Sequence, residues 1–297
     1  MASDPTSPPA REQRAGCLVI IGGNEDREHD KLVLRRVVEL AGRPNPRMVV
    51  LTAAGDEAVG LLEVYRRVFS ELGVGACLGL ELGSRDEAND PGAADRLLNA
   101  DGVFITGSDP KRLLALTGGT AVHRALQQAF HQFGQCIAGT SAGASALAQH
   151  MLQDGEGLAA GLGLLQRAVI DQHFSERQRL GRLLQVVAQN PTLIGVGIDE
   201  DTALVIEPCG GLEVVGDGAV TLLDGRQMSS NFLAGHDRAA LELIDVKLHL
   251  VPAGARYVCD DVNAPPRGAG RWRQPRQVPP ALQGIATLLT SPGSIPS

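Results

Sequence analysis

The stretch Gly139-Thr140-Ser141-Ala142-Gly143 decides both the fold class and the chemistry expected of this chain. It follows an apolar run over residues 135–138, typical of a buried strand, and precedes a helix-compatible run over residues 142–149. A G-x-S-x-G motif between a strand and a helix is typical of a nucleophile elbow, whose glycines allow a sharp turn at the serine. Such matches also arise by chance, and the strand–turn–helix context is what favours Ser141 as a nucleophile. The amide of Ala142 would then point at a developing oxyanion.

Upstream of this motif, short apolar runs alternate with segments of helical periodicity. Predicted strands lie at 17–21, 47–52, 74–80, 102–106 and 135–138, and predicted helices at 29–41, 59–72, 95–100 and 121–133. This alternation predicts an α/β fold, with a mostly parallel sheet sandwiched by helices. Gly-rich polar loops follow three strands, at 22–26, 106–109 and 139–143. Ligands of such sheets bind beyond the carboxyl ends of the strands, so the three loops mark the expected site.

The second half of the chain has a different pattern. A helix is predicted at 177–188, and short strands are predicted at 193–198, 202–207, 212–215, 219–223, 241–251 and 255–258. Glycine-rich turns between them favour β-hairpins added at one end of the sheet. Residues 1–16 read as a disordered tail, and residues 263–297, with seven prolines, as a loosely ordered one. The expected organisation is a single domain over residues 17–262.

Composition excludes several classes of protein. Of the 297 residues, 43% are hydrophobic and 3% aromatic, and the net charge is −7. This is enough apolar material for a core, while the charge and the scarcity of aromatics argue against nucleic-acid binding and a polybasic membrane surface. No signal peptide or spanning segment is evident, so we expect a cytoplasmic protein. The five cysteines form no C-x-x-C pair, which argues against zinc and redox sites and favours reduced thiols.

A serine nucleophile needs a base and a carboxylate that orients it. His173 ends an apolar run before a predicted helix, and Asp199, Glu200 and Asp201 follow the predicted strand at 193–198. One of these acids could reach the His173 ring, although a solvated acidic turn is the alternative for each. The order Ser, His, acid differs from the Ser, acid, His order of α/β-hydrolases, so a different fold is expected.

Three arginines follow His173 closely. Arg179 and Arg182 would share a helix face, and Arg177 would lie to one side. Guanidinium groups bind carboxylates in a bidentate manner, so the cluster predicts an anion site. A solvated helix face pairing with Glu176 is the alternative.

Together these motifs resemble the cyanophycinases of serine peptidase family S51, which also includes the aspartyl dipeptidase peptidase E. The resemblance spans residues 17–260 and rests on residues 139–144, 171–183 and 197–203. It implies a class I glutamine amidotransferase-like fold, a homodimer, no metal or cofactor, and hydrolysis of cyanophycin into β-aspartyl-arginine dipeptides. By this resemblance Ser141 is the nucleophile, His173 the base and Glu200 the orienting acid. The resemblance also implies a substrate pocket made of Asp171, Gln172, Arg177, Arg179 and Arg182. Asp171 would be available to a substrate guanidinium.

One segment departs from the family pattern. Where that pattern reads Gly-Gly-Asp-Gln, this chain has Gly107-Ser108-Asp109-Pro110. The amide of Ser108 can still donate to an oxyanion, and Asp109 matches a pocket residue, but Pro110 cannot replace the hydrogen bonds of glutamine. A shorter β-aspartyl peptide is therefore the alternative substrate. An aspartyl dipeptidase and a catalytically silent module that binds acidic peptides are the alternative functions.

Overall fold

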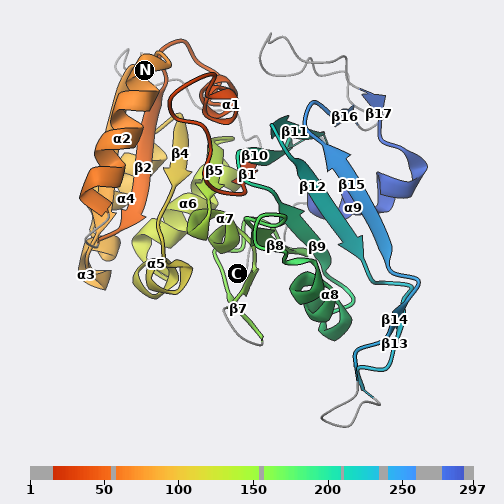
Figure 1. Cartoon of the computed structure of the whole chain (residues 1–297). Helices are drawn as coiled ribbons and strands as arrows, with labels where there is room; N and C mark the ends of the chain where they lie inside the picture. Colours follow the sequence, from red (N-terminus) through yellow and green to blue (C-terminus); the bar gives the residue numbers. More distant parts are fainter. Residues whose placement is uncertain are drawn as a thin grey trace, which may run out of the picture.

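A long mixed sheet forms the centre of the molecule (Figure 1). The computed structural model describes residues 16–54, 58–153, 157–208, 211–233, 240–258 and 276–290. Within these residues the sheet has the order β17-β16-β11-β10-β1-β5-β4-β2-β3. Its strands are β1 (Cys17–Ile21), β2 (Arg47–Ala53), β3 (Ala76–Leu82), β4 (Gly102–Ile105), β5 (Cys136–Thr140), β10 (Thr202–Ile206), β11 (Leu212–Gly216), β16 (Arg256–Val258) and β17 (Arg276–Gln277). The run β3-β2-β4-β5-β1 is parallel, whereas β10, β11 and β16 are each antiparallel to the strand before them, which confirms the predicted α/β class.

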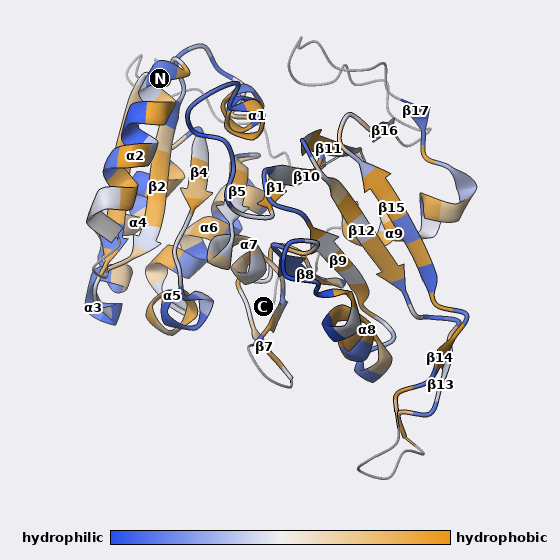
Figure 2. Cartoon of the chain, in the orientation of Figure 1, coloured by the Kyte–Doolittle hydropathy of each residue, from blue (hydrophilic) through white to orange (hydrophobic). Residues whose placement is uncertain are grey.

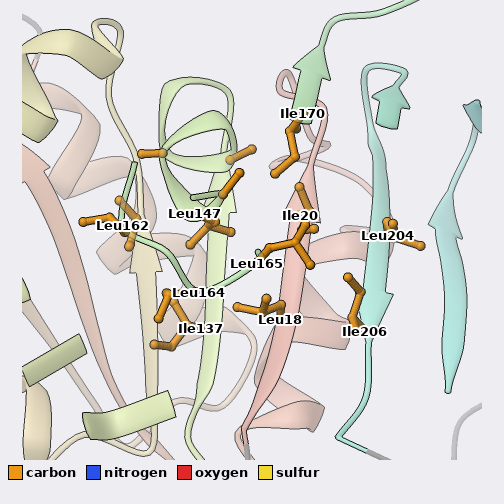
Figure 3. Close-up of a cluster of buried hydrophobic side chains, with 14 of the residues drawn as sticks. Leu18, Ile20, Ile137, Leu147, Leu162, Leu164, Leu165, Ile170, Leu204 and Ile206 are labelled. Atoms are coloured by element: carbon orange, nitrogen blue, oxygen red, sulfur yellow. The ribbon is translucent and has the colours of Figure 1, made fainter. Parts of the chain in front are cut away.

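Helices cover both faces of the parallel half. One face packs against α1 (Leu32–Leu40) and α2 (Ala58–Glu71), and the other packs against α3 (Arg85–Asn89), α4 (Pro91–Leu98), α5 (Pro110–Thr117), α6 (Ala121–His131) and α7 (Ala142–Leu147). Side chains alternate along β1, so that the two faces of the sheet have separate cores. Val19 faces α1 and α2, while Leu18 and Ile20 enter the core on the opposite face, the second core, with Ile137 and Leu147 (Figure 3). The helices are amphipathic and the strands apolar, as the hydropathy colouring of β2 and α2 shows (Figure 2). The carboxyl ends of β1, β4 and β5 therefore share one edge.

A second sheet, not expected from the sequence, packs on the second core. Its order is β15-β12-β9-β8, with β8 (Ala168–Gln172), β9 (Ile194–Ile198), β12 (Ala219–Asp224) and β15 (Lys247–Pro252). Ile170 and Val196 enter the shared core, while Val169 and Leu223 pack against Leu183 of α8 (Leu180–Gln189) on the other face. The predicted β10–β11 hairpin is confirmed. The expected addition of β12 to the same sheet is wrong, because β12 pairs with β9. Alternating patterns indicate strands but do not select their partners.

Two predictions need correction, one for a helix and one for the C-terminal tail. The helix expected at 177–188 begins only at Leu180, since residues 174–179 form turns. The loosely ordered tail expected at 263–297 is wrong for residues 276–290, which form β17 and α9 (Pro280–Thr290). Leu282, Ile285 and Leu289 of α9 are buried in the second core. Proline favours the first turn of a helix, so Pro280 begins α9 rather than preventing it. Residues 1–15, 263–275 and 291–297 lie outside the described residues.

Short hairpins complete the fold. They are formed by β6 (His150–Leu152) with β7 (Leu158–Ala160), and by β13 (Ser229–Ser230) with β14 (Leu243–Ile244). Cys17, Cys77 and Cys136 are free thiols, and Cys209 and Cys259 lie outside the described residues. Burial raises the pKa of Cys77 to about 11, against the opposing charge of Arg66. Across the described ranges, no helix has both the length and the apolar composition to cross a bilayer, and no cluster of three metal-ligating side chains occurs.

Candidate active site

Ser141 lies on a strained turn between β5 and α7. Its φ of 51° and ψ of −114° are rare for a non-glycine residue. A Cβ atom on Gly143 would lie 2.2 Å from the Ile105 carbonyl oxygen, and one on Gly139 would lie 2.6 Å from the Gly143 carbonyl oxygen. Both glycines are therefore required by the close approach of α7 to the ends of β4 and β5. The Ser141 amide donates to the Ile21 carbonyl at 3.2 Å, which ties the elbow to β1.

The structure brings Ser141, His173 and Glu200 together in one hydrogen-bonded chain. The Ser141 Oγ atom lies 3.1 Å from His173 Nε2, and His173 Nδ1 lies 2.6 Å from Glu200 Oε1. With the proton on Nδ1 donated to Glu200, Nε2 can accept the Ser141 hydroxyl proton. His173 directly follows β8, and its amide donates to the Gly22 carbonyl at 2.8 Å. The arrangement is that of a nucleophile, a base and an orienting acid drawn from three separate connections.

The three consecutive acids have separate partners. Asp199 accepts hydrogen bonds from the amide and the hydroxyl of Ser175, and Asp201 accepts one from the Asp26 amide at 2.8 Å. Only Glu200 among them hydrogen-bonds His173. The segment is a turn, with Asp201 at a φ of 44°. The choice of Glu200 agrees with this geometry, because each neighbouring acid is fixed by its own contacts.

Electrostatics keep Glu200 ionised. Partial burial opposes the charge on this carboxylate, but hydrogen bonds from His173 and Asn24 outweigh it, aided by the positive charge of Arg177, so the pKa of Glu200 is lowered. The Asn24 Nδ2 atom donates to Glu200 Oε2 at 2.9 Å, so both oxygens of the carboxylate are bound. An ionised Glu200 can hold the imidazole in place and would stabilise an imidazolium if His173 took a proton.

The loop after β1 lies at the site as expected, but its contacts with these groups were not predicted from the sequence. Gly23 has a φ of 98°, and a Cβ atom there would lie 2.4 Å from His173 Cε1, so the ring packs directly on this glycine. Glu25 is only 2% exposed, and it accepts hydrogen bonds from Thr140 Oγ1 at 2.6 Å and from the Tyr65 hydroxyl. Burial, and then the charge of Glu25, raise the pKa of Tyr65, which stays protonated and a donor. The adjacent glycines were a loop signal, but no sequence pattern shows what a loop will touch.

The predicted oxyanion donors lie at the expected edge. Ala142 opens α7, so its amide is among those with no acceptor inside the helix. Ser108 lies exposed in the turn between β4 and α5, and the contact of Gly143 with Ile105 brings this turn beside the elbow. Their roles as oxyanion donors stay predictions.

The pocket segment at Gly107-Ser108-Asp109-Pro110 begins a helix. Asp109 Oδ1 accepts from the amides of Lys111 and Arg112, which caps α5, and Pro110 is the first residue of that helix. Proline suits the first position of a helix because it has no backbone N–H that would need an acceptor, and its side chain makes no hydrogen bond. Contact of Asp109 with substrate stays a prediction.

The arginines are organised around a buried carboxylate. Asp171 is 0% exposed, and it lies 2.7 Å from Arg179 Nη1 and 3.4 Å from Arg182 Nε. The Arg179 Nη1 atom also donates to Gln172 Oε1 at 2.8 Å, whereas Arg177 is exposed. Arg179 and Arg182 thus share Asp171 as a partner, but not as two residues of one helix face, because Arg179 precedes α8. The burial of Asp171 does not fit direct contact with a substrate guanidinium; its carboxylate instead positions the two arginines.

Comparison with known proteins agrees with this geometry. Residues 18–210 match the family described as "Peptidase family S51". The chain is 32% identical over 254 residues to the cyanophycinase of Geminocystis herdmanii (strain PCC 6308), covering 81% of this chain and 92% of that protein. It is also 32% identical over 251 residues to the cyanophycinase of Nostoc sp. (strain PCC 7120 / SAG 25.82 / UTEX 2576), covering 81% and 84%.

A solved structure supports the fold. The crystal structure of a peptidase from an acI-B1 Actinobacterium superposes with a TM-score of 0.63 at 19% identity, covering 84% of this chain and 98% of that one. The family match extends from β1 to beyond β10, so it includes the elbow, His173 and Glu200. The chain therefore belongs to peptidase family S51, and it is a serine hydrolase.

Proposed function

We propose that this chain is a serine exopeptidase that hydrolyses cyanophycin to β-aspartyl-arginine dipeptides through an acyl-enzyme. The observation that carries the proposal is the Ser141–His173–Glu200 chain, at 3.1 and 2.6 Å, beside arginines anchored on a buried aspartate. The cyanophycinases that match most of the chain support the choice of substrate.

The chemistry follows from the geometry of the site. The Ser141 Oγ atom attacks the scissile carbonyl carbon while its proton passes to His173 Nε2. The amides of Ala142 and Ser108 stabilise the oxyanion of the tetrahedral intermediate. That intermediate collapses by breaking the C–N bond, and His173 gives its proton to the leaving amine. Water then attacks the acyl-enzyme with His173 again as the base, and Ser141 leaves with its proton restored.

Substrate recognition rests on the arginine cluster. A β-aspartyl-arginine unit carries a free carboxylate, and in this proposal Arg177, Arg179 and Arg182 bind it. Asp171 holds Arg179 and Arg182 at defined positions, and Gln172 limits Arg179 further. A guanidinium held by a carboxylate on one side can present its remaining N–H groups to a ligand on the other.

Two alternative functions were considered, one of them an enzyme and the other a binding module without activity. An aspartyl dipeptidase of the peptidase E type would use the same triad, and Pro110 favours it because the family glutamine is missing. A catalytically silent module that binds acidic peptides is disfavoured by the complete hydrogen-bonded chain. Labelling of Ser141 by a fluorophosphonate would exclude the silent module.

We further propose that the protein is a cytoplasmic homodimer. Apolar side chains are exposed on the β13–β14 arm and on β15, an edge strand of the second sheet. Leu233 is 96% exposed and Leu250 65% exposed, with Ile244 and Leu248 at 51% each. A second copy covering this surface would bury them. Light scattering should give twice the chain mass, and Leu250→Asp should shift it towards the monomer.

The decisive experiment is incubation of the purified protein with cyanophycin and mass analysis of the products. We expect β-aspartyl-arginine dipeptides from the wild type and none from Ser141→Ala. A higher kcat/KM on an α-aspartyl dipeptide than on cyanophycin would overturn the choice of substrate in favour of the dipeptidase.

A further inference from the structure

A charged cavity of about 430 Å³ lies beside the triad. It is lined by residues 24–29, in the connection between β1 and α1, and by Val64 and Arg67 of α2. This connection is drawn in red in Figure 1 and is hydrophilic throughout (Figure 2). The volume lies within the range of roughly 300–1,000 Å³ that is usual for small-molecule sites. None of its residues belongs to the arginine cluster around Asp171, so the cavity is a separate feature.

Two residues of the cavity also contact the catalytic machinery. Asn24 lines the cavity and donates to Glu200 at 2.9 Å. Glu25, at the buried side, accepts from Thr140, the residue before Ser141. The cavity is therefore connected to the triad through one contact with Glu200 and one with the residue before Ser141.

Hydrogen bonds within the loop define the walls of the cavity. The Asp26 carboxylate accepts the backbone amides of Glu28, His29 and Lys31 at 2.8–2.9 Å, which fixes the loop. Arg27 lies 5.5 Å from the centre of the Tyr65 ring. A preformed site binds with a smaller loss of conformational entropy than one that must be ordered.

Two charged residues that line the cavity have no ion-pair partner among the residues that the structure describes. Arg27 lies 3.6 Å from Glu25, and His29 lies 3.5 Å from Asp26, so both already face carboxylates. Arg67 and Glu28, by contrast, are exposed and make no ion pair with any residue that the structure describes. A ligand that satisfies both must itself carry a carboxylate and a cation.

We propose that this cavity is a subsite for a further β-aspartyl-arginine unit of the polymer, beyond the two units that flank the scissile bond. Arg67 binds the free carboxylate of that unit, and Glu28 binds its guanidinium. Because every unit of the polymer carries the same pair of charges, a second contact on one chain raises the affinity for long substrates over short ones. The inference rests on the proposed function, and it names the part of the substrate that this cavity takes.

The test compares chain lengths. KM and kcat are measured for wild type, Arg67→Glu and Glu28→Gln on cyanophycin and on an oligomer of two β-aspartyl-arginine units. Each variant should raise KM for cyanophycin by about three- to tenfold, at least threefold more than for the oligomer, because contacts between exposed charges are weak. The effect of salt on KM for cyanophycin should be smaller in Arg67→Ala than in wild type.

Arg66→Glu is the matched control, since Arg66 is the neighbouring residue on α2, pairs with Glu63 and does not line the cavity. It should change the KM ratio of the two substrates by less than about twofold. An equal effect of Arg67→Glu on both lengths, no effect on either, or the same effect from Arg66→Glu would overturn the subsite alone. Failure of wild type to cleave both substrates would instead overturn the proposed function.

Discussion

The triad and the arginine cluster are built in different ways, although His173 of the triad lies only a few residues before the arginines in the sequence. Backbone contacts hold the triad, since the Ser141 amide is bound by Ile21 and the His173 amide by Gly22. Side-chain charges hold the arginines, which converge on Asp171 from a turn and the start of α8. A backbone frame tolerates almost no substitution, whereas a side-chain cluster can change without disturbing the frame. Loss of a triad member should therefore cost far more activity than an equally small change among the arginines.

The largest effect is expected for the nucleophile. Ser141→Ala should reduce kcat by about a million-fold, because a methyl group cannot attack the carbonyl, and His173→Ala should cost a similar factor. Steady-state assays on cyanophycin check this. Ser145→Ala, one turn along the same helix, is the control and should stay within about tenfold of wild type. Activity within tenfold of wild type in Ser141→Ala would exclude the mechanism.

The next prediction distinguishes two adjacent carboxylates, Glu200 and Asp201, as the acid that orients His173. Glu200→Gln keeps the size of the side chain but removes the charge that stabilises the imidazolium, so kcat should fall by about a thousand- to ten-thousand-fold. Asp201→Asn should have a much smaller effect, because the amide oxygen can still accept from the Asp26 amide. Measured kcat values for the two variants decide the assignment, and the reverse ranking would move the role to Asp201.

Substitution of Gly23 tests the backbone frame that holds the triad. In Gly23→Ala the new Cβ atom would lie 2.4 Å from His173 Cε1, so the ring must move, and kcat should fall by about a hundredfold. Gly73→Ala is matched in backbone strain, since Gly73 has a φ of 84° and nothing within 4 Å of the added atom. The control should lower Tm without lowering kcat. Equal kcat in both variants would show that the frame is more adaptable than the geometry indicates.

The arginine cluster should respond more weakly. Arg182→Lys keeps the charge but loses the planar fork, so KM for cyanophycin should rise by about tenfold while kcat changes little. Arg35→Lys, an exposed position on α1, is the control for the loss of an arginine at the surface. A fall in kcat as large as that of Gly23→Ala would mean that the cluster belongs to the catalytic frame.

The smallest effect concerns pH. Asn24→Ala removes a hydrogen bond that favours the ionised form of Glu200, so the pKa of Glu200 rises and the His173–Glu200 pair binds a proton more easily. Activity requires the unprotonated base, so the acid limb of the kcat/KM profile should move to higher pH, by about half to one unit. Asn24→Asp, which adds a second carboxylate, should move it further in the same direction. A shift to lower pH in either variant would contradict the assigned contact.

Local patterns predicted much of the fold and the site. The elbow at Ser141 was predictable because its strand, turn and helix are adjacent in the chain. The spacing of Arg179 and Arg182 predicted a shared helix face, whereas the structure joins them through Asp171 with Arg179 outside the helix. The second sheet was not predictable, because β9 and β12 read as ordinary strands and their pairing depends on packing across the intervening residues 199–218. The contacts of Gly23 and Asn24 were hidden for the same reason.

The sequence by itself determined the α/β class, the nucleophile with its turn, and the residue types of the base and the acids. Those properties arise from periodicity and from neighbours along the chain, which short-range sterics control. Glu200 was chosen among the three adjacent acids by family resemblance alone, and its contact with His173 is seen only in the tertiary structure. Only the tertiary structure decided that Asp171 serves the arginines, and that Gly23, Asn24 and Glu25 support the triad. Each of these depends on the meeting of residues that are far apart in sequence, and that meeting is fixed by the packing of β1, β5, β8 and β9 around a shared core.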